Sequence, residues 1–353
     1  MKPTIADAST LPQPSQRFAT VQTWAEVLRT GNLSAGRHMD AVTRWLLIAR
    51  ASVFTMTLTS AAIGGLLAAA EEESFHWVAF LLTALGLTLC HASNNMTNDY
   101  LDLESGVDTP DYARALYAPH PILSGLVSKA GLLAAIALVN LATLGIAVYL
   151  TYLRGWPVLV FTGLGFFLSL FYVAPPLRLK HRGLGELSVF VVWGPLMIGG
   201  AYYTTSGELT PWAILASIPY AVLVTTVLIG KHLDKAEQDQ AKGIHTMVVL
   251  LGERASLALN RALMVGFYVV VLGLVLAGVL GVWVALVALS LARLRSVLSA
   301  YSRPRPERAP PGYPIWPLWF VAWAFLLTRR AGLLFLAGLI LNLVLPLQVP
   351  WGP

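Results

Sequence analysis

Long apolar runs, separated by polar segments, recur along most of the chain. A helix needs about 20 apolar residues to cross a bilayer, and nine runs come close to that length or exceed it. They lie near residues 46–70, 76–98, 129–152, 157–174, 186–204, 211–231, 256–278, 280–299 and 331–347. The pattern therefore predicts an all-α polytopic membrane protein with nine transmembrane helices.

The N-terminal segment differs from the rest of the chain. Residues 1–40 are mostly polar and contain Pro12 and Pro14, so we expect a flexible N-terminal tail on the cytoplasmic side. A short surface helix is expected within it, over residues 23–29. Residues 41–353 are expected to form one transmembrane domain.

One apolar run is too short to span a membrane. Residues 315–327 contain Trp316, Trp319 and Trp323, and tryptophan is enriched where a membrane meets water. We therefore expect this run to lie at the interface or to lead into the last span.

Composition agrees with a membrane protein and excludes other classes. Hydrophobic residues make up 56% of the chain and charged residues 12%, whereas soluble domains carry about 25% charged residues. The single cysteine, Cys90, lies inside an apolar run, which excludes a disulfide framework. The net charge of +6 does not indicate a nucleic acid partner, because the excess Lys and Arg residues lie in loops between apolar runs.

The Lys and Arg residues also predict the orientation. They concentrate before the first predicted span and after the fourth, sixth and eighth, whereas the opposite loops hold mainly Glu71, Glu72, Glu73, Arg154 and Glu208. Cytoplasmic loops are enriched in Lys and Arg. We therefore expect a protein of the cell membrane with its N-terminus in the cytoplasm and its C-terminus outside.

Acidic and amide side chains gather where the second apolar run ends. Four of them are spaced i, i+3, i+4 and i+7, which places them on one helix face. They are Asn95, Asn98, Asp99 and Asp102. Asp108 follows Gly106, where we expect the helix to end. Such carboxylates cost several kcal/mol in a membrane unless they are paired, hydrated or bound to metal, and Mg²⁺ prefers oxygen ligands shared with a substrate phosphate. The alternative is a solvated helix end.

A second acidic stretch follows the sixth predicted span. Residues 231–245 contain Asp234, Glu237 and Asp239. Both stretches fall on the predicted cytoplasmic side, and a pseudo-symmetric bundle would place them opposite each other across a central cavity. Together they predict a Mg²⁺ site shared by two helices.

The two stretches resemble the paired motifs of the UbiA-type intramembrane prenyltransferases. Residues 98–108 (NDYLDLESGVD) are similar to the first motif, and residues 234–243 (DKAEQDQAKG) are similar to the second. The resemblance implies a UbiA-type bundle around a central cavity and Mg²⁺-dependent transfer of a prenyl group from a polyprenyl diphosphate to an aromatic acceptor. The catalytic, metal-binding residues that it implies are Asp99, Asp102, Asp234 and Asp239, with Asn98 as a further metal ligand.

The second motif departs from the family pattern, in which the aspartates are three or four residues apart. Asp234 and Asp239 are five apart, which separates them by about 140° on a straight helix. One solution is a π-bulge or a helix end between them, so that both reach the cavity. The other is that Glu237 binds the metal and one aspartate turns away. We favour the first, because Gly243 keeps its family distance from Asp239.

A diphosphate also needs cations. The loop from Tyr172 to Arg182 carries three of them and is similar to the family pattern after the fourth helix; simple positive-inside anchoring is the alternative. His120 is either structural or a contact for the diphosphate or acceptor, and Arg50 either points into the cavity or snorkels to the interface. The candidate diphosphate contacts are Asn95, Asn98, Arg178, Lys180, Arg182, His120 and Arg50, with Asp108, Glu237 and Tyr172 as further site candidates.

The acceptor is indicated by a longer stretch. Residues 183–187 (GLGEL), leading into the next apolar run, resemble the 1,4-dihydroxy-2-naphthoate polyprenyltransferases of the menaquinone pathway. Residues 174–180 (APPLRLK) are more similar to chlorophyll synthases and archaeal lipid prenyltransferases. We give the longer match more weight and expect 1,4-dihydroxy-2-naphthoate as acceptor, with demethylmenaquinone as product.

Two kinds of alternative function remain. Within the same fold, the acceptor could be 4-hydroxybenzoate, homogentisate, a chlorophyllide or a glycerol phosphate lipid. In another class, the aspartates could be the ion sites of a cation-coupled transporter. Transporter sites lie near the middle of the bilayer, whereas both acidic stretches here lie at the ends of predicted spans.

Overall fold

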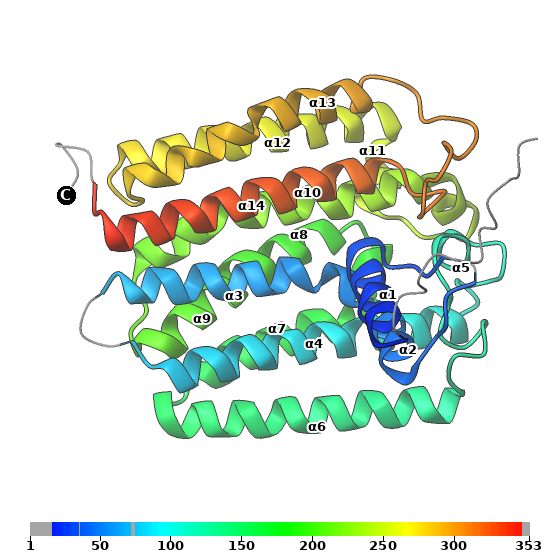
Figure 1. Cartoon of the computed structure of the whole chain (residues 1–353), viewed down its shortest axis with the longest axis horizontal. Coiled ribbons are helices and arrows are strands. Elements are labelled where there is room, and N and C mark those ends of the chain that lie inside the picture. Colours follow the sequence, from blue (N-terminus) through cyan, green and yellow to red (C-terminus); the bar gives the residue numbers. More distant parts are fainter. Residues whose placement is uncertain (1–15, 35, 72–74, 348–353) are drawn as a thin grey trace, which may run out of the picture.

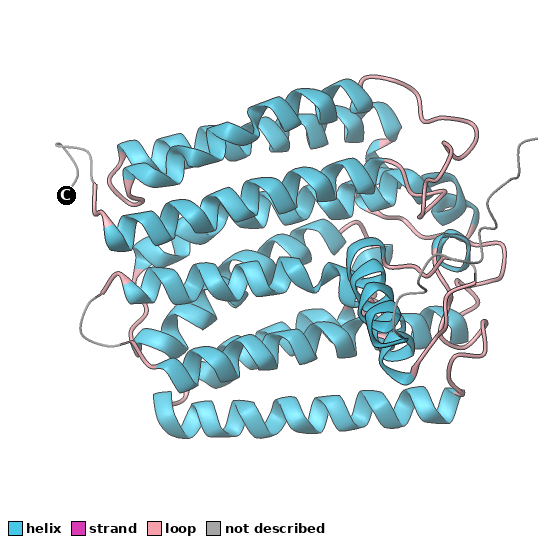
Figure 2. Cartoon of the chain, in the orientation of Figure 1, coloured by secondary structure: helices cyan, strands magenta, loops and turns pink. Residues whose placement is uncertain are grey.

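The computed structural model describes residues 16–34, 36–71 and 75–347. Within this part of the chain every regular element is helical (Figures 1 and 2). The elements are α1 (Gln16–Thr30), α2 (Ala41–Ile48), η2 (Ala51–Val53), α3 (Phe54–Ala69), α4 (Trp77–Glu104), α5 (Ala113–Tyr117), α6 (Lys129–Arg154), α7 (Pro157–Phe171), η3 (Leu179–His181), α8 (Gly185–Val191), η4 (Val192–Leu196), α9 (Met197–Ser206), α10 (Pro211–Ala241), α11 (Met247–Leu251), α12 (Glu253–Leu276), η5 (Val282–Ser290), α13 (Leu291–Tyr301) and α14 (Phe320–Val344).

The predicted membrane fold is confirmed. Among the described residues, 8 helical segments are long and apolar enough to cross a bilayer. Three of them combine several elements: η2 with α3 forms Ala51–Ala69, α8, η4 and α9 form Gly185–Ser206, and η5 with α13 forms Val282–Tyr301. The ninth predicted span, residues 157–174, corresponds to α7, which has only 15 residues. The total of nine spans therefore stays a prediction.

The boundary of the last span differs from the prediction. The helix α14 begins at Phe320 and continues to Val344, so most of the tryptophan-rich run belongs to it and the predicted start near residue 331 is wrong. The run does lead into the last span, as one of the two interpretations held. Trp319 at the start of α14 supplies no capping side chain, so the first amides of this helix depend on a partner from elsewhere in the bundle.

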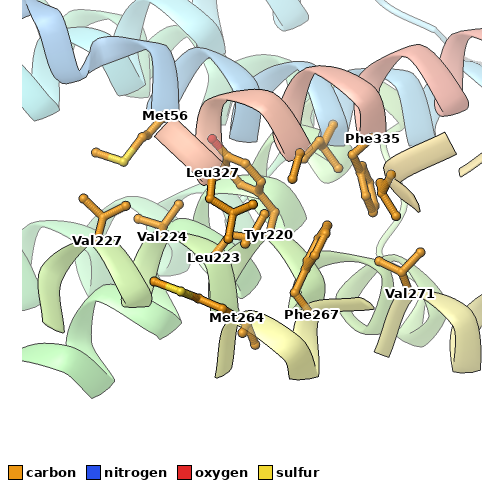
Figure 3. Close-up of a cluster of buried hydrophobic side chains, with 14 of the residues drawn as sticks. Met56, Tyr220, Leu223, Val224, Val227, Met264, Phe267, Val271, Leu327 and Phe335 are labelled. Atoms are coloured by element: carbon orange, nitrogen blue, oxygen red, sulfur yellow. The ribbon is translucent and has the colours of Figure 1, made fainter. Parts of the chain in front are cut away.

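The helix α10 is the central element of the bundle. In its most apolar stretch 78% of the residues are buried, against 11% for α6, which lies at the edge of the bundle in Figure 1. Tyr220 and Leu223 of α10 pack with Phe267 of α12 and with Leu327 and Phe335 of α14 (Figure 3). Most of the surface of α6 is thus free to face lipid, whereas α10 is fixed on nearly all sides.

Close helix packing depends on particular glycines. A Cβ atom at Gly64 of α3 would lie 2.4 Å from the carbonyl oxygen of Ile198 in α9. A Cβ atom at Gly230 of α10 would lie 2.9 Å from Cα of Val321 in α14. Small residues let membrane helices approach this closely, and the second contact brings the start of α14 beside the acidic end of α10.

The N-terminal segment packs on the bundle over its described residues, so the predicted flexible tail is wrong for this part. The expected helix over residues 23–29 lies within α1, which crosses the ends of the other helices in Figure 1. The indole Nε1 of Trp24 donates to Asp40 at 2.9 Å, and the amide of Asn32 donates to the carbonyl of Tyr117 at 3.0 Å. Residues 1–15 lie outside the described residues.

The packing of α3 on α9 predicts a large difference between two glycine substitutions. We expect Gly64→Ala to lower the free energy of unfolding by about 1–3 kcal/mol, because the added methyl group overpacks a fixed backbone contact. Gly145→Ala on the lipid-facing side of α6 meets no atom within 4 Å and serves as the control. Thermal unfolding of the two purified proteins in detergent measures the difference. Equal stability of both variants would contradict the close α3–α9 contact.

Candidate functional site

The two acidic motifs lie at the same end of the bundle. The first occupies the last turns of α4, which ends at Glu104 and is followed by Gly106 with a positive φ of 74°, as expected. The second occupies the last turns of α10. The loop between α4 and α5 joins them, because Val107, Tyr112 and Ile244 form one buried cluster and the hydroxyl of Tyr112 donates to Asp239.

Asp99 is the most enclosed carboxylate of the first motif and is fully buried. Arg114 contacts it with two nitrogens, Nε at 2.8 Å and Nη2 at 2.9 Å. Arg50 forms a second ion pair with the same carboxylate. Two guanidinium groups therefore compensate this one buried carboxylate.

The backbone around Arg50 is built to direct this side chain. Arg50 adopts a left-handed conformation, with φ 54° and ψ 48°, between α2 and η2. Such a conformation costs free energy in a residue other than glycine and is typical of functional sites. The amide of Asn95 donates to the carbonyl of Ala49 at 3.0 Å. Asn95 was expected to contact the diphosphate. Its hydrogen bond instead supports the backbone between α2 and η2 that positions Arg50.

Only one of the three predicted basic residues in the loop after α7 reaches the site. Lys180 donates to both carboxylate oxygens of Asp102, at 2.6 and 2.9 Å. Arg178 and Arg182 are exposed, and Arg182 donates to the carbonyl of Pro176 at 3.0 Å. The sequence left open which of these three candidates contacts the diphosphate, and the structure places Lys180 beside the first motif and both arginines at the surface. The backbone carbonyl of Tyr172 accepts a hydrogen bond from the backbone N–H of Lys180 at 2.9 Å, which helps to hold this turn.

Asp99, Asp108 and His120 form a compact buried cluster. Each offers one ligand atom, and these atoms lie within 4.8 Å of one another. The Nδ1 atom of His120 accepts two backbone N–H groups at 3.3 Å, so its Nε2, 3.3 Å from Asp108, carries the proton in the neutral ring. The oxygen atoms of the two aspartates suit Mg²⁺, and His120 is placed to orient Asp108.

The charge of Asp108 is favoured by its surroundings. Burial by itself raises the pKa of this loop carboxyl, but contact with His120 and the charges of Arg50 and Arg114 outweigh burial, so the pKa lies below its usual value. Asp108 is therefore an anion at neutral pH. Nearby, Asn98 has a buried Oδ1 atom without a partner among the described residues, which adds a further oxygen donor.

In the second motif Asp239 faces the first motif. It is fully buried and accepts Lys235 Nζ at 3.1 Å as well as the hydroxyl of Tyr112. Lys235 also donates to Tyr112 at 2.9 Å. This triangle of charges and hydroxyl fixes the loop of the first motif on the helix of the second.

Asp234 faces a different partner. Its carboxylate accepts the backbone N–H groups of Phe320 at 2.9 Å and Val321 at 3.0 Å. It therefore caps α14, whose own first residue supplies no cap. The helix α10 is a continuous α-helix to Ala241, so the expected π-bulge or early helix end is wrong, and Glu237 is exposed. The π-helical turn lies elsewhere, in η4, which contains Pro195.

A cavity of about 1510 Å³ extends from the motifs into the bundle. Its charged end is lined by Arg50, Arg114, Asn98 and Lys231, and Tyr172 borders it as well. Deeper, apolar side chains of α4, α6, α7, α9 and α10 form most of its wall. The shape and polarity suit an amphiphile with an anionic head and a long apolar tail.

Four residues of this site were not among those predicted from the sequence, namely Tyr112, Arg114, Lys231 and Lys235. Tyr112 and Arg114 lie at the start of the short helix α5, in a segment without a periodic pattern, so spacing gave no sign of them. Lys235 had a signal, because it precedes Asp239 by four residues and so shares its helix face.

Comparison with known sequences identifies the family. Residues 57–312 match the sequence model of a family described as the UbiA prenyltransferase family. The chain is 27% identical over 228 residues to a 2-carboxy-1,4-naphthoquinone phytyltransferase from Synechocystis, covering 64% of this chain and 72% of that protein. It is 26% identical over 214 residues to a 1,4-dihydroxy-2-naphthoate octaprenyltransferase from Bacillus subtilis, covering 61% and 67%.

Solved structures agree on the fold. A UbiA homolog from Aeropyrum pernix has a TM-score of 0.62 and 20% identity, covering 82% of this chain and 98% of that one. A UbiA homolog from Archaeoglobus fulgidus, solved with GPP and Mg²⁺ bound, has a TM-score of 0.57 and 15% identity, covering 83% and 99%. At these identities the likeness shows the fold alone.

The contacts of Asp234 predict a structural defect. We expect Asp234→Ala to lower the free energy of unfolding by about 1–2 kcal/mol, because two amides at the start of α14 lose their acceptor. Thermal unfolding measures it, and Glu237→Ala, which removes an exposed carboxylate three residues away, is the control. A variant as stable as the control would show that Asp234 does not cap α14.

Proposed function

The chain belongs to the UbiA prenyltransferase family, and from this premise we propose that it transfers a polyprenyl group from its diphosphate to 1,4-dihydroxy-2-naphthoate in a Mg²⁺-dependent reaction. The observation that carries the proposal is the charge pattern of the cavity. Arg50, Arg114 and Lys231 line its charged end, where the first two pair with a carboxylate of the first motif, and apolar side chains line its interior. This pattern fits a prenyl diphosphate better than a small soluble ion.

The residues proposed to hold Mg²⁺ are Asp99, Asp102, Asp108 and Asp239, together with the free oxygen of Asn98. They supply hard oxygen donors from both motifs, as Mg²⁺ requires. Asp234 is omitted, because its carboxylate is engaged by the backbone of α14. When bound, Mg²⁺ would neutralise charge on the diphosphate as the allylic C–O bond breaks.

The cations are proposed to bind the diphosphate oxygens. Lys180, Arg114 and Lys235 each pair with a carboxylate of the two motifs, and Arg114 also lines the cavity. A negatively charged head group that enters with its metal can take over these contacts without new charges having to be buried. Charge-assisted hydrogen bonds of this kind then stabilise the leaving group as negative charge develops on it.

In the proposed reaction, the electron pair of the allylic C–O bond leaves with the diphosphate. A ring carbon of the acceptor provides the electron pair of the new C–C bond. When the attacked carbon carries the carboxylate, loss of CO₂ returns an electron pair to the ring. Water would capture an allylic cation, and the apolar walls of the cavity exclude it.

The choice of acceptor is supported by the relatives. Two of them are named for naphthalene rings that carry a carboxylate. We further propose that the protein lies in the cell membrane with both motifs on the cytoplasmic side, because the loops at that end hold most of the Lys and Arg residues.

The direct test is turnover by the purified protein without an ion gradient. We expect release of diphosphate from geranylgeranyl or longer prenyl diphosphates only when 1,4-dihydroxy-2-naphthoate and Mg²⁺ are both present, loss of turnover with EDTA, and recovery with added Mg²⁺. Product analysis by mass spectrometry against a panel of other acceptors tests the acceptor. Turnover with 4-hydroxybenzoate alone, for example, would refute the acceptor, and no turnover with any acceptor would refute the reaction.

Asp102 provides a test of the metal-binding role. Asp102→Ala should abolish turnover while the protein stays folded, because the shared site loses a ligand and the counterion of Lys180. The control is Asp111→Ala, which removes an exposed carboxylate near the same motif. Activity of Asp102→Ala close to that of the control would exclude the role.

Lys180 provides a test of diphosphate binding. Lys180→Met should weaken the use of prenyl diphosphate by about 1.5–3 kcal/mol in kcat/KM, the range for one charge-assisted hydrogen bond. Arg182→Met is the matched control, since it removes an exposed cation from the same loop and should have little effect. The same loss in both variants would indicate that the loop acts only through its net charge.

A further inference from the structure

Lys231 lines the cavity and has no role in the proposed function so far. Along α10, Val224, Val227, Leu228 and Lys231 line the cavity, so Lys231 ends an apolar stripe. It precedes Lys235 by four residues, which places it about 6 Å deeper along the helix. Lys231 therefore lies at the boundary between the charged mouth and the apolar interior.

Lys231 differs from its neighbours in having no counterion. Arg50 and Arg114 pair with Asp99, and Lys180 pairs with Asp102. No hydrogen bond or ion pair joins Lys231 to any other residue that the structure describes, whereas the positive charges of Arg50, Lys235, Lys180 and Arg114 all act on it. Burial and these charges disfavour the ammonium form of Lys231 in the empty cavity, and an anionic group of a substrate at this depth would supply the counterion that stabilises it.

The diphosphate is not the best candidate for that anion. Its oxygens can bind the cations nearer the mouth, whereas Lys231 lies below them. An aromatic surface is close instead. The charge of Lys231 reaches His91, and the ring of His91 meets that of Trp193 edge-on at 5.2 Å. All three residues line the cavity, so a flat ring with an anionic substituent fits this place.

We propose that Lys231 binds the carboxylate of the aromatic acceptor and makes the enzyme selective for rings that carry one. The inference rests on the proposed function and goes beyond it by naming the group that is recognised and the residue that recognises it. The carboxylate supplies the counterion that the protein lacks, and the ring is held beside the apolar part of the cavity where the prenyl chain would lie. Lys231 is thus a specificity-determining residue.

Two stable probes test the assignment without turnover. 1-Hydroxy-2-naphthoate and 1-naphthol differ only in the carboxylate, and their dissociation constants can be measured with the full-length protein in detergent by tryptophan fluorescence. We expect the wild-type protein to bind the carboxylate about 10-fold to 100-fold more tightly than the naphthol. Lys231→Met should remove this difference, and Lys231→Arg should retain most of it. Lys129→Met, which changes an exposed lysine at the start of α6, is the matched control.

Kinetics separate this role from two others. For Lys231→Met we expect a raised KM for 1,4-dihydroxy-2-naphthoate and an unchanged KM for the prenyl diphosphate. A raised KM for the diphosphate instead, or equal binding of both probes by the wild-type protein, would overturn the assignment. Equal loss of both probes in Lys231→Met and Lys231→Arg would assign Lys231 to structure and also overturn it.

The two proposals can fail separately. A wild-type protein that prefers the carboxylated probe through Lys231 but transfers no prenyl group would refute the reaction and leave the recognition of a carboxylate standing. A protein that transfers prenyl groups but binds both probes equally would refute the recognition of a carboxylate by Lys231 and leave the reaction standing.

Discussion

The structure depends on the cost of placing carboxylates at the ends of membrane helices. Four of the motif aspartates are compensated by a cation or by backbone amides, and the fifth lies against a histidine. For Asp99 the compensation comes from Arg50, before α3, and from Arg114, in α5. One carboxylate therefore ties three separate segments together, and the same contacts form the mouth of the cavity.

The helix α10 combines two roles because its aspartates are five residues apart. On an unbroken α-helix this spacing turns them to different sides. Asp239 faces the first motif, whereas Asp234 caps α14. The departure from the family spacing thus joins the site to the structural core instead of adding a ligand. Close contact at Gly230 makes this possible, because it brings the start of α14 against α10.

The distribution of charge with depth connects the fold to the proposed chemistry. Arg50 and Arg114, both paired with Asp99, line the charged end of the cavity. Lys231, which has no counterion among the described residues, lies about one helical turn deeper than Lys235, and apolar side chains form most of the remaining wall. A prenyl diphosphate has the same order of groups, from an anionic head to an apolar chain. Under the proposed function, these ion pairs compensate the charges of the empty site and would be exchanged for substrate contacts when the diphosphate and its metal bind.

The sequence by itself determined the membrane fold, the end of α4 just before Gly106 and the two acidic motifs, because apolar length and helical spacing are local properties. It did not determine which cations reach the site. Lys180 does and Arg178 does not, since the loop backbone turns sharply, with φ 45° at Arg178. Nor did it reveal that Asp234 caps a helix 86 residues away. Side-chain direction in loops and contacts between distant helices arise only when the bundle packs, so only the tertiary structure decided them.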